Sequence, residues 1–401
     1  MALSRRGLMA ATLAAGALTI GAATAASAQD TVKIGYVVSK TGPNAAGAET
    51  TTIPNYELWV HDVNEAGGLK LPDGSQRMIE VVEYDDRSQT EEVVRGIERL
   101  ARQDEVDFIL APWGTGFNLA VAPLMARFGY PQLAGTAVIP SIGDFAERWP
   151  MSFWLLGSAE DYTGDLVSVL DSAAEAGTIN KQVAMISIAD GFGIELSTSA
   201  REALSEGGFE LVMDKTYPLG TQDFGTLISE AEASGADIFL AYSYPGDTFA
   251  ITKQAQLSGY NPKVFYTGVG TNFPVYPQIM EGKTAGVMSL GGISQSDAMQ
   301  EYTKRHNEVL GKAPDNWASP VIYASLQALA QSIERKGLDR EAVGAELGSG
   351  TFDTVLGQIS LEDNQLKDIF HVGQWQDGSF LGVAPAEKQG AAEPVIPKPD
   401  W

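Results

Sequence analysis

The sequence predicts an α/β fold of two Rossmann-like lobes, each built on a parallel sheet. Short apolar runs alternate with longer amphipathic stretches along the chain, which is the pattern of strand–helix–strand units. This alternation occurs as two separate series. The 401 residues also exceed what one hydrophobic core usually serves. We therefore expect two lobes.

The first series begins at Val32. Its expected strands are short, rich in β-branched or aromatic residues and bounded by turn residues, as buried parallel strands are: Val32–Val38, Ile79–Glu83, Phe108–Ala111 and Tyr130–Leu133. Ser88 and Glu91 have the spacing of a capping box and precede an apolar helical face. A helix is therefore expected between the second and third strands.

The second series follows a composition shift near residues 149–158. Its expected strands are Val183–Ile188, Leu211–Tyr217, Ile238–Tyr242 and Val264–Tyr266, with helices near Leu196–Ser205, Phe224–Ala233 and Asp247–Leu257. Later helices near Met299–Leu310 and Pro320–Lys336 do not extend this series, and we interpret them as a return to the first lobe. Ser319 and Pro320 form a typical helix start.

These patterns predict the division of the chain. Residues 29–155 and 290–350 are expected to form the N-terminal lobe, and residues 156–289 and 351–385 the C-terminal lobe. The proline-rich end, residues 386–401, is expected to be an irregular tail.

The first 28 residues have the pattern of a secretory signal peptide. Arg5 and Arg6 precede an alanine-rich apolar run. The run is followed by a cleavage site of small residues, Ala26-Ser27-Ala28. Ser4-Arg5-Arg6-Gly7-Leu8 also resembles a twin-arginine signal, so general secretion and twin-arginine export both stay open. We expect an exported protein with no stable membrane insertion after signal cleavage.

Charge and cysteine content exclude several classes of function. The chain carries 27 basic and 51 acidic residues, a net charge of −24, which argues against binding nucleic acid or anionic lipid. It has no cysteine, so disulfides, thiol nucleophiles, thiolate metal sites and a lipid-attachment cysteine are excluded. A free monomer in a Gram-negative periplasm is the expectation.

No motif for catalysis or for a cofactor is complete. Three strand-to-helix junctions contain paired glycines, but the third glycine of the dinucleotide fingerprint is replaced in each, by Leu119, Leu196 and Phe273. The histidines lack metal-ligand spacing: His61, His306 and His371. Asp85 and Asp86 are interpreted as turn residues rather than an acid–base pair. We expect no enzyme activity, no cofactor and no metal.

The candidate site lies in loops after the strands, because open α/β sheets bind ligands outside the carboxyl ends of their strands. The loop through Gly114 and Thr115 leads into a helix whose N-terminus would stabilise an anionic oxygen. Thr136 offers a second hydroxyl. Aromatic residues after the strands would supply flat walls, although Trp113 and Tyr242 suit core packing equally well. The candidate ligand-binding residues are Trp113, Gly114, Thr115, Thr136, Ala137, Phe192, Tyr242, Tyr244, Gly268 and Val269.

An ordered set of short segments carries a family resemblance across nearly the whole chain after the leader. The segments are Val32–Gly35 with Thr41-Gly42-Pro43, Asp62–Gly68, Tyr84–Asp86, Asp190–Gly193, Asp223-Phe224 and Asp353–Gly357. In this order they resemble the branched-chain amino acid uptake family of periplasmic solute-binding proteins.

The resemblance implies a type I periplasmic binding protein fold, with two lobes joined by three crossovers in a hinge and closing on a ligand. It implies delivery to permease subunits of an ABC transporter. The loops at Gly114–Gly116 and Thr136–Val138 would hold a ligand carboxylate, and Phe192 stands where the family commonly has tyrosine. The family's carboxylate for an amino acid's ammonium is expected near Val269, and an apolar residue stands there instead.

The predicted function is therefore an extracytoplasmic substrate-binding component that closes around a small carboxylate-bearing ligand: an amino acid, an amide or an aromatic acid. The alternative is a sensory module of the same fold that passes occupancy to a membrane receptor.

Overall fold

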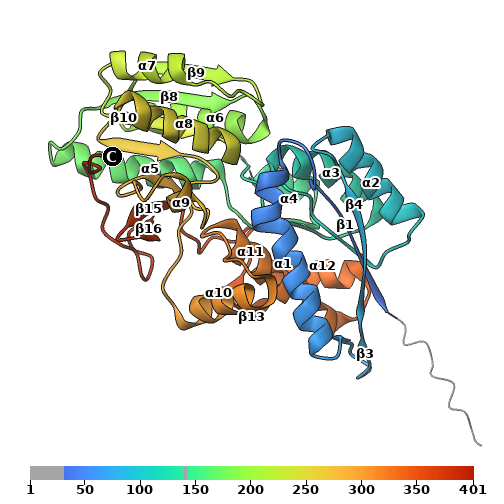
Figure 1. The fold of residues 1–401 in the computed structure, drawn as a ribbon. Coiled ribbons are helices and arrows are strands. Elements are labelled where there is room, and N and C mark those ends of the chain that lie inside the picture. Colours follow the sequence, from blue (N-terminus) through green and yellow to red (C-terminus); the bar gives the residue numbers. More distant parts are fainter. Residues whose placement is uncertain (1–30, 140–141) are drawn as a thin grey trace, which may run out of the picture.

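The computed structural model describes residues 31–139 and 142–401. The predicted signal peptide lies outside the described residues. Two α/β lobes are visible, with the N-terminal lobe in blue and teal and the C-terminal lobe in green and yellow (Figure 1). The two-lobed α/β prediction is confirmed in this arrangement.

The N-terminal lobe is built on the parallel three-stranded sheet β4-β1-β5. Its strands are β1 (Val32–Val38), β4 (Ile79–Asp85) and β5 (Phe108–Leu110), followed by the parallel pair β6 (Gln132–Ala134) and β7 (Ser152–Trp154). A small antiparallel pair joins β2 (Leu69–Lys70) and β3 (Gln76–Arg77). Helices of this lobe are α1 (Ala45–Glu65), α2 (Thr90–Arg102), α3 (Thr115–Phe128) and α4 (Ile142–Arg148).

The C-terminal lobe contains a seven-stranded sheet in the order β16-β15-β12-β11-β10-β8-β9. Its parallel part holds β8 (Gln182–Ile188), β9 (Glu210–Tyr217), β10 (Ile238–Tyr242), β11 (Val264–Thr267) and β12 (Met288–Leu290). The helices are α5 (Ala159–Glu175), α6 (Gly191–Glu206), α7 (Gly225–Ala233), α8 (Pro245–Ser258) and α9 (Tyr276–Ile279).

Two antiparallel strands extend the parallel part of this sheet. They are β15 (Val372–Gln376) and β16 (Ser379–Ala384). Asp377 and Gly378 connect them with φ of 48° and 81°. A two-residue Asp-Gly turn with positive φ at both positions favours an antiparallel hairpin.

The chain returns to the N-terminal lobe after β12. The returning elements are α10 (Asp297–Leu310), α11 (Ala318–Lys336), α12 (Arg340–Ser349) and the hairpin of β13 (Thr351–Thr354) with β14 (Gly357–Ser360). Gln331 of α11 donates to the carbonyl oxygen of Asp353 at 2.9 Å. The hairpin therefore lies against α11, whereas the later β15 and β16 join the C-terminal sheet.

The chain passes between the lobes three times. The first crossover follows β7, the second follows β12, and the third leads from β14 to β15. The first and third run side by side, because Trp154 forms a parallel bridge with Gln365. These segments make the hinge that the type I fold requires.

Two predicted helix starts differ in detail. Helix α2 begins at Thr90, and Ser88 lies in a left-handed turn (φ 58°) with its hydroxyl donating to the carbonyl of Thr41. Ser88 is therefore no helix cap. Helix α11 begins at Ala318, before Ser319 and Pro320, because Asp315 accepts hydrogen bonds from the first amides.

Asp85 and Asp86 are turn residues, as predicted. The Asp85 carboxylate accepts from the amides of Thr41 and Arg87. Asp86 accepts from the Ser39 hydroxyl at 2.6 Å and the Ser88 amide at 2.7 Å. Their hydrogen bonds fix the loop that follows β1 to the loop that follows β4.

The C-terminal tail has no regular secondary structure but is bound to the C-terminal lobe. Trp401 donates from Nε1 to the Tyr260 carbonyl at 2.8 Å, and its ring meets Phe265 edge-on. Lys398 is 4% exposed, and its Nζ lies 3.5 Å from the centre of the Trp401 ring. Burial lowers the pKa of Lys398 to about 8, against the opposing charge of Asp400.

A pH-dependent stability follows from Lys398. Between pH 8 and about 10.4 the folded chain holds a neutral amine while the unfolded chain binds a proton, so this residue makes stability rise with pH. Lys398→Met should remove that rise, measured as the difference in urea unfolding free energy between pH 7.5 and pH 10. Lys33→Met, at an exposed lysine, is the control. An identical pH dependence in Lys398→Met and wild type would contradict the assignment.

Candidate functional site

The loop before α3 is held in place by two threonine hydroxyls. Thr136 Oγ1 accepts from the Gly114 amide at 3.0 Å and donates to the Pro112 carbonyl at 3.2 Å. Thr115 Oγ1 accepts from the Val138 amide at 3.2 Å. Both hydroxyls thus bind the loops after β5 and β6 to each other and position the backbone amides there.

The N-terminus of α3 has no side-chain cap within the described part of the chain. Its N-cap is Gly114, whose φ of 94° is a conformation that favours glycine. The first amides of an uncapped helix lack partners and carry partial positive charge. They are suited to an anionic oxygen.

The neighbouring helix starts in the cleft are already capped by carboxylates. Asp190 accepts from the amides of Phe192 and Gly193 at the start of α6. Asp247 accepts a backbone hydrogen bond at the start of α8, and Asp315 accepts such bonds at the start of α11. Among these four helix starts, α3 alone lacks a carboxylate on its first amides.

Aromatic rings from the two lobes meet across the cleft. The ring centroids of Trp113, from the N-terminal lobe, and Tyr244, from the C-terminal lobe, lie 5.1 Å apart. The Phe192 ring stacks on that of Tyr244, with centroids 5.3 Å apart. Trp113 packs closely on α1, where a side chain at Gly47 would lie 2.1 Å from the indole. Three of the predicted aromatic residues therefore converge.

Two chambers of the cleft share Trp113, Gly114 and Tyr244. The small chamber leaves about 20 Å³ for the centre of a water molecule to occupy. Its lining residues are Thr51, Trp113, Gly114, Thr115, Thr136, Leu156, Phe192, Tyr244, Val269, Trp317 and Ala318. None of these described residues carries a charge. About 20 Å³ is room for one water, so a solute enters only when the rings or lobes separate.

The large chamber leaves about 240 Å³ by the same measure and is more polar. Asn44, Ser88, Thr90 and Asp190 line it together with the shared ring pair. Asp190 is its one acidic residue among the described lining residues. The ring pair thus stands between an apolar chamber and a polar, acidic one.

Seven of the ten candidate residues line the small chamber, and three do not. Tyr242 is fully buried and its ring faces Tyr266, so it belongs to the core of the C-terminal sheet. Ala137 packs with Trp149 and Trp154. Gly268 allows close approach to Ser243, whose carbonyl oxygen would lie 2.2 Å from an added Cβ.

Four lining residues were missed by sequence reasoning. Thr51 comes from α1, Leu156 from the first crossover, and Trp317 and Ala318 from the start of α11. Trp317 donates from Nε1 to the Tyr162 hydroxyl at 2.8 Å, which fixes its ring. One signal in the sequence could have found Trp317. It is an aromatic residue beside the predicted helix start near Ser319, and that helix was expected to return to the first lobe.

The carboxylates near the cleft are held in a low-dielectric environment. Tyr244 donates its hydroxyl to Asp190 Oδ2 at 2.8 Å. Burial raises the pKa of Asp190, although hydrogen bonds from Tyr244 and two amides lower it. Burial raises the pKa of Asp247 to about 6. Burial and the Asp190 charge raise the pKa of Tyr244 well above 10, so Tyr244 remains a donor.

The lobes touch where the starts of α3 and α6 meet. An added Cβ at Gly191 would lie 3.3 Å from the backbone of Gly116. This is a contact between backbones, and it brings the two lobes into the closed arrangement that encloses the small chamber. Glycine at position 191 permits that approach.

Other ionisable clusters have partners of their own. His61, Asp62 and Glu65 are grouped closely enough to hold a cation. Arg305, however, donates to Asp62 at 2.8 Å and pairs with Glu65.

Among residues 31–139 and 142–401, no helix has the length and apolarity needed to span a membrane.

Comparison with known proteins identifies the family. The family model described as periplasmic binding protein matches residues 31–379. The chain belongs to the periplasmic binding protein family. It is a solute-binding protein and not an enzyme, as the sequence predicted.

Relatives and solved structures share its full length. Leu/Ile/Val-binding protein homolog 7 of Brucella abortus (strain 2308) is 23% identical and is matched over 93% of this chain and 95% of that protein. LivJ of Streptococcus pneumoniae, a branched-chain amino acid transporter substrate binding protein in complex with isoleucine, is 21% identical. Its TM-score is 0.75, with 92% and 100% of the two chains covered.

A solute binding protein of an ABC transporter from R. palustris, in complex with benzoate, gives a TM-score of 0.76 at 17% identity, covering 91% of this chain and 99% of that one. The type I periplasmic binding protein fold is thereby confirmed.

The contact between α3 and α6 makes a testable prediction. Gly191→Val should place a branched side chain against Gly116 and hold the lobes apart, which small-angle scattering would record as a larger radius of gyration. Gly246→Val, at an exposed position in the first turn of α8 with no atom within 4 Å of an added Cβ, is the matched control. Equal radii for the two variants would contradict the role of this contact.

Proposed function

We propose that the chain is the extracytoplasmic substrate-binding component of an ABC uptake transporter and closes around a small carboxylate. The observation that carries the proposal is the small chamber, which combines aromatic walls from both lobes with the uncapped start of α3. A solute that touches both lobes stabilises the closed arrangement over the open one. The permease subunits would then recognise the closed shape.

A carboxylate would bind the first amides of α3. Thr115 and Thr136 hold these amides in place through their hydrogen bonds to the Val138 and Gly114 amides. No lysine, arginine or histidine is among the described lining residues of the small chamber. The positive end of the helix is the source of favourable charge there.

The ligand's apolar body would lie between rings. Phe192 and Trp317 are 3% and 5% exposed, and Val269 is 5% exposed. Val269 lies where the family resemblance expects an acid for an ammonium group. A buried ammonium without a counter-charge costs several kcal/mol. Among amino acids, amides and aromatic acids, an acid that lacks the ammonium therefore fits best.

Asp190 is the nearest competing partner for an ammonium group. Its Oδ1 caps α6, and its Oδ2 accepts from Tyr244. It lines the large chamber and not the small one. An ammonium bound in the small chamber would therefore not have this carboxylate among the residues around it.

The proposed location is the periplasm, after export by either secretion route, as a free monomer. A sensor, which is the alternative function, would use the same cleft and the same closure. It differs only in the membrane partner, so co-purification with permease subunits tests it.

Matched ligand pairs test the absence of an ammonium partner. The pairs are 4-methylpentanoate with leucine, and 3-phenylpropanoate with phenylalanine, which differ only by the amine. The acids should raise the melting temperature because they bind only the folded chain, while their amino acid counterparts should not. Stabilisation by the amino acids alone would contradict the proposal.

Substitutions at Phe192 and Val269 test the walls. Phe192→Ala removes a stacked wall and should weaken binding of a stabilising aromatic acid roughly tenfold, by titration calorimetry. Val269→Asp should instead shift preference toward the amino acid of each pair. Leu257→Ala, at a residue 78% exposed, is the control. An affinity unchanged by Phe192→Ala would remove the site assignment.

A further inference from the structure

A second cavity, here called the hinge pocket, lies among the crossovers behind Trp317. It is lined by segments from the second crossover, the start of α11, the third crossover and the chain after β16. Trp317 lines both the hinge pocket and the small chamber of the cleft. The indole of Trp317 is therefore common to the hinge pocket and the cleft.

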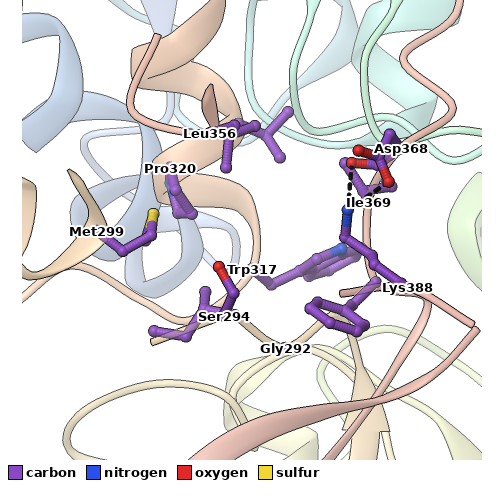
Figure 2. Close-up of a pocket in the computed structure, with 12 residues that line it drawn as sticks. Gly292, Ser294, Met299, Trp317, Pro320, Leu356, Asp368, Ile369 and Lys388 are labelled. Carbon is purple, nitrogen blue, oxygen red and sulfur yellow. Dashed lines mark hydrogen bonds and ion pairs between the residues drawn. The ribbon is translucent and has the colours of Figure 1, made fainter. Parts of the chain in front are cut away.

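One side of the hinge pocket is apolar. Figure 2 shows Met299, Pro320 and Leu356 around one side of its central space, with Trp317 beside them. Phe370 adds another ring. The space leaves about 50 Å³ for the centres of water molecules. At roughly 10–15 Å³ per water, three or four water-sized groups in a row fit inside.

The opposite side of the hinge pocket carries one ammonium. Lys388 is the single cation among the described lining residues, and Figure 2 shows it across the central space from Pro320. Its Nζ pairs with Asp368, donates to the Asp368 carbonyl at 3.0 Å and lies 5.3 Å from the centre of the Phe370 ring.

The Lys388–Asp368 pair is unequally buried. The Lys388 side chain is 17% exposed, whereas that of Asp368 is 87% exposed. An exposed carboxylate contributes little to such a pair, because water and salt screen it. An anion bound inside the pocket could pair with the buried ammonium of Lys388. Displacing the exposed Asp368 carboxylate from that ammonium would cost little free energy.

We propose that the hinge pocket is a second binding site, for a short aliphatic carboxylate whose chain lies against Met299, Pro320 and Leu356 and whose charge meets Lys388. The site shares no charged residue with the cleft, and Trp317 lines both. The apolar side accommodates a short carbon chain, and the single ammonium favours one negative group.

The test follows the Met299 methyl group in the full chain. Protein labelled with ¹³C at its methionine methyl groups is titrated with hexanoate, and the Met299 resonance is assigned by Met299→Leu. No methionine is among the described residues that line either cleft chamber. Hexanoate should shift the Met299 resonance saturably. 1-Hexanol, of matched length and uncharged, should bind more weakly.

Two variants of the ion pair should act in opposite directions. Lys388→Gln should weaken hexanoate binding about tenfold or more, because a charge-assisted hydrogen bond is lost. Asp368→Asn should tighten it about two- to fivefold, since the competing carboxylate is removed. Thermal unfolding of both variants confirms that they fold.

A cleft variant separates the second site from the proposed function. Phe192→Ala should leave the Met299 titration unchanged, even if that variant shows the cleft proposal to be wrong. A Met299 resonance that does not respond, a response equal in wild type and Lys388→Gln, or a response abolished by Phe192→Ala would each overturn the hinge site.

Discussion

The cleft depends on two helix N-termini that face each other across the lobes. Helices α3 and α6 meet at Gly116 and Gly191 with only backbone between them. Both ends carry partial positive charge, and two like ends in contact repel each other. Asp190 neutralises the start of α6 by accepting from two amides, while the start of α3 keeps its charge. This asymmetry makes the contact stable and leaves one positive end available.

Hydrogen bonds around α3 hold the loop at its positively charged N-terminus in a fixed geometry. Asn118 donates to the Pro112 and Gly114 carbonyls at 2.8 and 2.9 Å, and Gln132 donates to the Asn118 carbonyl at 3.0 Å. These side chains are buried. A loop held by buried, satisfied polar groups presents its amides with little reorganisation, which is what selective binding of an anionic oxygen requires.

Much of the fold was predictable because its signals are local. Strands such as Ile238–Tyr242 are short apolar runs between turns, and parallel strands place their following loops on one edge, so the convergence of Thr115, Phe192 and Tyr244 followed from topology. Tyr242 and Tyr244 show the limit. They are two residues apart, yet Tyr242 pairs within the sheet and faces the core, whereas the chain has left the strand at Tyr244.

Other parts depend on contacts between distant segments, which periodicity does not encode. Trp317 reaches the cleft because α11 packs beside α1, and its indole bonds to Tyr162 of the other lobe, 155 positions away. The start of α2 shifted because Ser88 bonds to Thr41, 47 positions earlier. At Ser88 a tertiary hydrogen bond replaced the local cap that the spacing indicated.

The ring pair of Trp113 and Tyr244 gives the cleft a direction along its length. On one side the walls are uncharged, and on the other Asp190 and Asn44 provide acceptors. A solute with an apolar end and a carboxylate end is thereby aligned in one sense, since a carboxylate turned toward the other side would meet the like charge of Asp190, which repels it. Because the two rings belong to different lobes, this alignment is imposed by closure itself and vanishes when the lobes part.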